Sequence, residues 1–166
     1  MSYASKQSFQ TNLNINSKHL NKDIDNLILI KLKEKYENKC SENGFIIEDS
    51  IEINKRKIGK IKTISNKSCI SYDVLYSADI IYPTEGDEIE IIVDRVNKMG
   101  VLGYININDN GFEDSPLIII IPSEYFNETT RDIDSITKFQ KINVKVLGCR
   151  IKFNSKKIQI VESPVS

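Results

Sequence analysis

The hydrophobic pattern of the first 36 residues predicts one strand followed by one long helix. From Phe9 to Ile15 apolar and polar residues alternate, which is the period of a half-buried strand. Apolar residues then recur every three or four positions up to Tyr36, as they do on one face of a helix. Asn21 is positioned to cap this helix, and acidic residues near its start and lysines near its end suit the helix dipole.

A strand pattern returns at Gly44 and predicts a hairpin with a basic tip. Apolar residues recur from Gly44 to Ile53 and again from Ile58 to Ile64, and the polar segment Asn54–Lys57 lies between these runs. The simplest interpretation pairs the two apolar runs with each other and exposes the polar segment as the turn. One more strand is predicted at Val74–Tyr82.

A domain boundary is predicted directly after this strand. Pro83 ends the strand, and Thr84–Asp87 has the composition of a turn or hinge. We therefore expect residues 1–83 to form a small antiparallel sheet with one helix, and residues 84–166 to form a second domain. The expected fold class is α+β and mostly β.

Five short apolar segments after the boundary predict five strands. The first, Ile89–Val96, is apolar on both faces over part of its length, as the bent first strand of a small barrel requires. The polar stretch from Asn127 to Lys138 is expected to hold a short helix or a disordered connection, and Gly148 to mark a bulge. Five strands with a long connection between the third and fourth match the layout of an OB barrel. The other four strands are expected at Val101–Ile107, Leu117–Ile121, Ile142–Val146 and Lys156–Val161.

Charge is segregated along the chain although the whole chain is neutral. The 23 basic and 23 acidic residues balance, so the protein is not a uniformly basic nucleic-acid binder. No acidic residue lies between Asp134 and Glu162, and the lysines and arginines there favour contact with phosphate. The alternative is a solvated sheet edge kept soluble by lysines. A second basic run, Lys55–Lys67, suits either docking on an acidic partner or simple solvation.

The sequence offers no catalytic or metal-binding constellation. The one histidine, His19, has no nucleophile motif near it, and no glycine loop of the phosphate-binding kind occurs. The acidic residues between 85 and 94 alternate along a strand without a histidine, which argues against a metal site. We expect no enzyme and no cofactor. Because the chain has no secretion signal and no long apolar run, we expect a soluble, intracellular protein with no membrane partner.

Several segments follow one another as they do in the large stalk subunit of eukaryotic and archaeal DNA-dependent RNA polymerases, and the sequence resembles this family from about Phe9 to Glu162. The most specific part is the strand before Pro83, then Gly86, the valine-rich strand and VNKMG at 96–100. The composition and compact loops are similar to the versions encoded by large DNA viruses. The remaining matching segments are Cys40-x-x-x-Gly44-Phe45, the glycine at 59, IPSEYF at 121–126 and VLGCRI at 146–151.

The resemblance implies a non-catalytic subunit with two parts. The N-terminal tip domain would dock at the base of the clamp of the core polymerase, and the C-terminal OB barrel, of the ribosomal S-one type, would contact nascent single-stranded RNA beside a smaller helical stalk partner. A viral version would act in the cytoplasm or be packaged in the virion, and a cellular one in the nucleus or the archaeal cytoplasm. The residues implied for core docking are Lys55, Arg56, Lys57, Ile58 and Gly59.

The sequence departs from the family where RNA-binding barrels carry aromatic rings. Met99 and Leu102 stand near the turn glycine, and the third strand has Ile120 and Ile121 where a polar residue or histidine is usual. Base stacking contributes roughly 1–3 kcal/mol per base, so we expect weakened RNA binding, with Tyr104 as the nearest substitute. The residues expected to contact RNA are Lys98, Met99, Leu102, Tyr104, Lys145, Arg150, Lys152, Lys156 and Lys157.

Two other functions remain open from the sequence. One is a free-standing module that binds single-stranded RNA and has no polymerase partner. The other is a structural adaptor without RNA contact, which the missing aromatic rings make credible.

Overall fold

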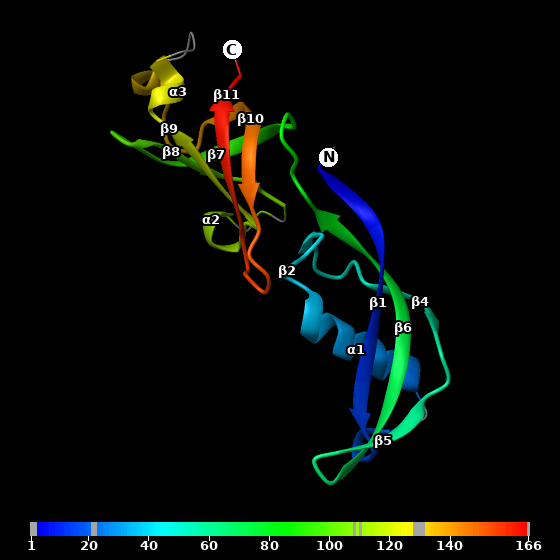
Figure 1. Ribbon diagram of the computed structural model, residues 1–166. Coiled ribbons are helices and arrows are strands. Elements are labelled where there is room, and N and C mark those ends of the chain that lie inside the picture. The colour runs from blue at the N-terminus through cyan, green and yellow to red at the C-terminus, as the bar shows by residue number, and fades with distance from the viewer. Residues whose placement is uncertain (1–2, 21–22, 108, 110, 128–131, 166) are drawn as a thin grey trace. The chain divides into compact units, whose positions relative to one another are not determined.

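The computed structural model describes residues 3–20, 23–107, 109, 111–127 and 132–165 (Figure 1). The chain divides into two compact units. The sheet unit comprises Ser5–Asn38 and Ile46–Ile80, and the barrel unit comprises Met1–Ala4, Lys39–Phe45 and Ile81–Ser166. The short segment Lys39–Phe45 therefore belongs with the barrel although it comes from the N-terminal half. The predicted boundary at Pro83 stays a prediction.

The N-terminal half forms a six-stranded sheet built around its longest strand, β6. β1 pairs with one edge of β6, and β3, β4 and β5 each pair with β6, while β2 pairs with β3. The strands are β1 (Ala4–Asn16), β2 (Cys40–Ser41), β3 (Gly44–Ile46), β4 (Glu52–Arg56), β5 (Lys60–Ile64) and β6 (Lys67–Ile81).

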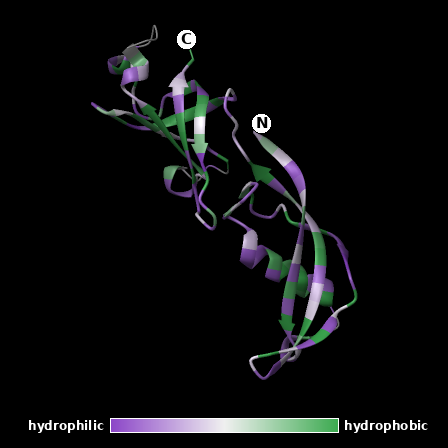
Figure 2. Cartoon of the chain, in the orientation of Figure 1, coloured by the Kyte–Doolittle hydropathy of each residue, from purple (hydrophilic) through white to green (hydrophobic). Residues whose placement is uncertain are grey.

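The core of the sheet unit lies between this sheet and the helix α1 (Ile24–Tyr36), which runs along β1 and β6 in Figure 1. Ile28 and Leu32, four positions apart on α1, are fully buried. The ring of Tyr76 on β6 stacks with Phe9 at 5.4 Å and with Tyr36 at 5.6 Å. Figure 2 shows hydrophobic and hydrophilic residues following one another along β1 and β6, as the predicted period-two pattern requires.

The helix begins with a different cap from the predicted one. Asp23 occupies the N-cap position, and its side chain accepts a hydrogen bond from the backbone N–H of Asn26 at 3.2 Å. Asn21, the predicted cap, lies outside the described residues. Both Asp and Asn are good caps, so spacing alone did not distinguish them.

The predicted hairpin with its tip at Asn54–Lys57 is wrong. β4 and β5 both pair with β6 and form consecutive segments along the same edge of it. The hairpin is instead formed by β5 and β6, and its turn is Ser65–Asn66, where both residues have positive φ as two-residue hairpin turns require. The basic residues of the predicted tip lie at the end of β4 and just after it.

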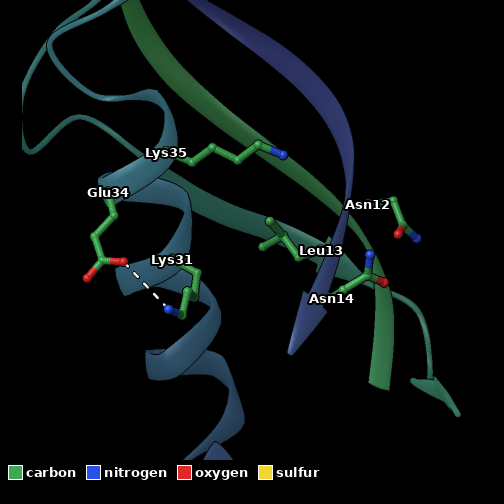
Figure 3. Close-up of a pocket in the computed structure, with 6 residues that line it drawn as sticks. All are labelled: Asn12, Leu13, Asn14, Lys31, Glu34 and Lys35. Carbon is green, nitrogen blue, oxygen red and sulfur yellow. Dashed lines mark ion pairs between the residues drawn. The ribbon is translucent and has the colours of Figure 1, made fainter. Parts of the chain in front are cut away.

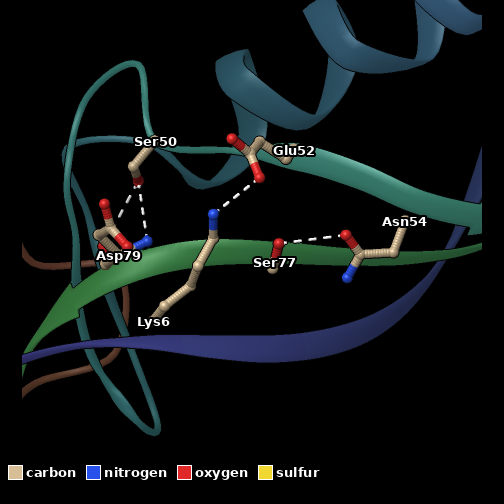
Figure 4. Close-up of polar contacts among 6 residues, drawn as sticks. All are labelled: Lys6, Ser50, Glu52, Asn54, Ser77 and Asp79. Carbon is tan, nitrogen blue, oxygen red and sulfur yellow. Dashed lines mark hydrogen bonds and ion pairs between the residues drawn. The ribbon is translucent and has the colours of Figure 1, made fainter.

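Polar side chains join the strands of the sheet unit (Figure 4). Lys6 on β1 forms an ion pair with Glu52 on β4 at 2.7 Å, and the hydroxyl of Ser77 donates to Asn54 at 3.2 Å. The hydroxyl of Ser50 accepts a hydrogen bond from the backbone N–H of Asp79 at 3.1 Å. These contacts tie β4 and the residues just before it to β1 and β6.

The five strands predicted for the C-terminal half are confirmed, and they form a closed barrel. Its strand order is β10-β11-β9-β8-β7, and β10 pairs with β7 to close it. β9 and β11 run parallel, and the other neighbours run antiparallel. The strands are β7 (Glu88–Asn97), β8 (Gly100–Tyr104), β9 (Leu117–Pro122), β10 (Lys141–Arg150) and β11 (Ile158–Pro164).

Alternate residues of these strands fill the barrel interior. The fully buried side chains include Ile89, Ile91, Leu117, Ile119, Ile121, Ile158 and Ile160. Gly100 begins β8 at φ 145°, and a Cβ there would lie 2.1 Å from the carbonyl oxygen of Ile121, so only glycine fits. The predicted bulge at Gly148 is confirmed by a register shift between Val146 and Gly148.

The barrel differs from the prediction at two connections, and a third contains a short helix, which was one of the two expected alternatives. β8 ends at Tyr104, because the buried hydroxyl of Ser115 accepts the next backbone N–H, that of Ile105, at 3.2 Å. The short helix α2 (Gly111–Asp114) follows the predicted loop at 108–111, of which positions 108 and 110 lie outside the described residues. The connection predicted at 127–138 follows the short helix α3 (Glu124–Asn127) and contains a 3-10 turn at Ile133–Ser135 beyond the undescribed positions 128–131. No helix in the described part of the chain is long and apolar enough to span a bilayer.

Candidate nucleic-acid interface

A basic hollow of about 480 Å³ lies where β10 passes into β11. Arg150, Gln159 and Ile118 lie side by side across β10, β11 and β9, because Gln159 is the register partner of both of the others. The loop from Ile151 to Lys157 completes the wall. The hollow is lined by Ile118, Arg150, Lys152, Ser155, Lys156, Lys157 and Gln159.

Hydrogen bonds on both sides hold this loop in one conformation. A turn is closed by the backbone N–H of Ser155, which donates to the carbonyl of Lys152 at 3.0 Å. Asn154 adopts φ 61° within the turn, a conformation that asparagine tolerates well. Cys40, in the same unit, donates its N–H to Ser155 at 2.8 Å and accepts the N–H of Asn154 at 3.0 Å. The segment Lys39–Phe45 thus braces the tip of the basic loop.

Lys157 is held in place by Phe112, whose ring packs against a second aromatic residue. Its ammonium donates to the carbonyl of Phe112 at 2.9 Å and lies 4.9 Å from the centroid of the Phe112 ring. That ring in turn meets Tyr104 edge to face at 5.9 Å. Tyr104 is only 6% exposed, so its ring offers little surface for stacking on a base.

The remaining predicted RNA contacts lie away from the hollow. Lys98 and Met99 form the turn between β7 and β8, at the Pro122 end of β9. Ile118, which lines the hollow, lies on β9 four residues before Pro122, which is roughly 13 Å away at the spacing of residues in a strand. Lys145 is exposed on β10 and is the register partner of Glu88 on β7. The structure therefore brings together Arg150, Lys152, Lys156 and Lys157 only.

An apolar stripe occupies the outer face of the barrel. Leu102 on β8 is the register partner of Ile120 on β9, and Ile120 in turn is the partner of Val161 on β11. Ile120 and Val161 are about two-fifths exposed. Aromatic or polar residues were expected near these positions in an RNA-binding barrel, and here the surface is aliphatic.

Sequence reasoning missed Phe153. It follows Lys152 in the braced turn and is 64% exposed. The signal was present, because an aromatic residue inside a loop of lysines has no core to fill. It was overlooked because it lies between the predicted strands Ile142–Val146 and Lys156–Val161, where only the basic residues were singled out.

The carboxyl of Glu162 lies inside the barrel unit. Glu162 is fully buried, and among the described residues neither of its oxygens has a hydrogen-bond partner. Burial raises the pKa of Glu162 to about 8. The pKa of Tyr3 is raised as well, mainly because the Tyr3 side chain is partly buried and to a lesser extent by the negative charge of ionised Glu162. Since Glu162 retains its proton through the neutral range, the acidic residue at the end of the basic segment does little to offset the lysines.

The residues implied for core docking lie at the end of β4 and just after it. Arg56 forms an ion pair with Asp25 on α1 and lies over the Tyr72 ring at 5.6 Å. Lys57 is exposed, and its ammonium lies 3.6 Å from the carboxylate of Asp73 on β6. Lys55 on β4 is exposed as well, and Ile58 is 88% exposed.

Two further features belong to the same edge of the sheet unit. A Cβ at Gly59 would lie 2.4 Å from Ile70, so glycine lets the chain pass close to β6. Ile61 on β5 is 82% exposed, and with Ile58 it forms an apolar pair among lysines that sequence reasoning did not single out.

The sheet unit also has a shallow groove between β1 and α1 (Figure 3). Asn12, Leu13 and Asn14 line it from β1, and Lys31, Glu34 and Lys35 from α1. Lys31 and Glu34 form an ion pair at 3.7 Å. No predicted site residue lies in this groove.

Among the described residues, histidine, cysteine and acidic side chains form no cluster that could hold a metal ion. No protein-family model matches this sequence, and no curated protein matches it either.

Proposed function

We propose that the chain is a non-catalytic stalk subunit of a DNA-dependent RNA polymerase, and that its barrel is an OB fold that contacts nascent RNA. The observation that carries the proposal is the barrel topology together with the place of the basic hollow. In chain order the strands run one, two, three, five, four around the barrel, with the third and fifth parallel. OB folds bind oligonucleotides through the second and third strands and the loops after the first and fourth strands. The hollow lies at the loop after the fourth strand.

The charges of the hollow suit a phosphate chain. Four cationic side chains converge there, and Ser155 and Gln159 add neutral hydrogen-bonding groups. None of the described residues that line the hollow is acidic. Because phosphate contacts release counterions, binding through such a surface weakens steeply with salt.

The sheet unit supplies the surface for the core enzyme. Ile58 and Ile61 are almost fully exposed, and exposed apolar residues rimmed by charge are typical of protein contacts. The neighbouring Lys55, Lys60 and Lys62 favour an acidic partner surface. Both features agree with docking at the base of a polymerase clamp.

Purification from the native source tests this proposal. The full chain, tagged at one end, should bring with it the two largest polymerase subunits at low salt, as identified by mass spectrometry. Recovery of the chain alone under these conditions would contradict the stalk assignment and favour a free-standing RNA-binding module.

A second candidate, an adaptor without RNA contact, is favoured by the aliphatic stripe of Leu102, Ile120 and Val161. An aliphatic surface suits a protein partner better than a base. The adaptor predicts that polymerase is recovered but that the purified chain has no measurable affinity for single-stranded RNA.

A further inference from the structure

The loop after β10 presents an aromatic ring to solvent on a backbone that several hydrogen bonds hold. Phe153 is 64% exposed, which by itself is ordinary for a surface residue. Its setting is less ordinary, because the turn is closed by the bond from Ser155 to Lys152 and is tied to Cys40 by two further backbone hydrogen bonds. An exposed ring on a fixed backbone loses little entropy when a ligand covers it.

The charges around Phe153 suit a ligand with alternating aromatic and anionic groups. Lys152 precedes the ring, Lys156 follows three residues later, and both line the hollow together with Arg150. A single strand of RNA combines phosphates with bases that are free to stack, and proteins bind it with cationic grooves that carry aromatic side chains. Duplex RNA keeps its bases stacked inside and would gain nothing from the ring.

A second exposed aromatic residue of the barrel unit serves as a comparison. Phe139 is 66% exposed, but the ammonium of Lys138 lies over its ring at 4.9 Å. Among the described residues, no cation–π or ring–ring contact involves Phe153. The two rings are equally accessible, but Phe153 lies in the turn between Lys152 and Ser155. Those two residues line the hollow, while Phe153 itself lies beside it.

We propose that Phe153 is a stacking platform for one unpaired base of single-stranded RNA, whose neighbouring phosphates bind Arg150, Lys152 and Lys156. This proposal rests on the proposed RNA contact of the barrel and makes it specific. It moves the stacking role from the positions of Met99, Leu102 and Tyr104 to the loop after β10. It also makes the bound species a single strand rather than a duplex.

The absence of tryptophan from the sequence allows a direct test. Phe153→Trp in the full chain creates a single tryptophan at the proposed platform, whose emission can be excited separately from that of the seven tyrosines, and Phe139→Trp is the matched control. A short, unstructured RNA oligonucleotide should quench the fluorescence of the first variant and leave the second unchanged, because stacking on a base quenches indole emission. Equal fluorescence with and without RNA at position 153, while the same sample binds the RNA, would overturn the proposal.

Affinity measurements separate this proposal from the proposed function. Phe153→Leu should weaken binding of the same oligonucleotide by about 5- to 100-fold without changing its salt dependence, whereas Phe139→Leu should have no effect. An oligonucleotide with abasic sites should bind wild type and Phe153→Leu equally. If wild type binds RNA and Phe153→Leu binds as tightly, the stacking role is wrong and the RNA contact stands. If wild type binds no RNA at all, both fail.

Discussion

Single residues decide two properties of this molecule, namely the charge of its interior and the chemistry of its basic loop. The sequence identified Glu162 only as the end of a basic segment, because burial depends on which face of β11 points inward. Its alternation with Ile158 and Ile160 places it inside the barrel. Phe153 shows the opposite case, an apolar residue between the predicted strands Ile142–Val146 and Lys156–Val161 that the structure places in solvent.

The buried carboxyl predicts a stability that falls with rising pH. The pKa of Glu162 is about 8 in the folded protein and near 4.5 when the chain is unfolded. Between these values the folded state keeps a proton that the unfolded state has released, so the contribution of Glu162 to stability is full below about pH 4.5 and declines up to about pH 8. The decline is at most about 1.4 kcal/mol for each pH unit crossed.

Denaturant unfolding across this pH range measures the effect. Glu162→Gln should remove most of the decline, leaving the smaller part due to Glu37, whose pKa burial also raises, and should make the protein more stable than wild type at the alkaline end. The exposed Glu124→Gln should behave as wild type. If the denaturant concentration at the unfolding midpoint of wild type stayed level or rose from about pH 4.5 to about pH 8, Glu162 would ionise normally in the folded protein.

At the scale of elements, the sequence predicted the existence of strands better than their partners. Short apolar or alternating segments bounded by turn residues located all five barrel strands, because each strand buries at least one face. The hairpin at Asn54–Lys57 was wrong because pairing is not encoded in periodicity, and the long β6 could accept both β4 and β5 along one edge. The clustering of Arg150 with Lys156 was predictable from charge, but the distance of Lys98 and Lys145 from them depended on barrel register.

The loop after β10 should carry most of the affinity for RNA. Replacing Arg150, Lys152 and Lys156 by glutamate should weaken binding of a single-stranded oligonucleotide. It should also flatten the plot of log affinity against log salt concentration, by about 0.7 in slope for each phosphate that the loop no longer binds. The same change at Lys60, Lys62 and Lys67, which are exposed in the sheet unit, should leave RNA binding unchanged. Filter binding or fluorescence anisotropy at several salt concentrations would compare the RNA affinities of the two triple variants. Equal weakening in both would indicate that RNA is attracted nonspecifically by the protein's overall charge.

The edge formed by β4 and β5 should carry the contact with polymerase. Aspartate at Ile58 and Ile61 should abolish recovery of the large subunits without lowering thermal stability, because both side chains are more than four-fifths exposed. Phe139→Asp, on the barrel, is the control and should copurify normally. Polymerase recovered equally with the Ile58 and Ile61 variant would place the docking surface elsewhere.

At the scale of the whole molecule, two units carry two kinds of surface. The barrel unit carries a basic loop with an exposed ring, and the sheet unit carries an apolar pair among lysines. The sequence could predict the mostly β content and the barrel, since these follow from local pattern. It could not predict that Lys39–Phe45 would join the barrel unit and brace its loop, because that contact joins residues more than a hundred positions apart.

Crosslinking of nascent RNA would show whether the loop after β10 meets the transcript within a working polymerase. Transcription complexes would be purified through the tagged full chain, allowed to extend a photoreactive transcript, and irradiated, and the crosslinked peptides would be identified by mass spectrometry. We predict that the large polymerase subunits are present and that the transcript crosslinks to the segment from Arg150 to Lys157. Complexes that contain polymerase and transcribe, but in which no crosslink reaches this segment, would contradict the proposed role of the barrel.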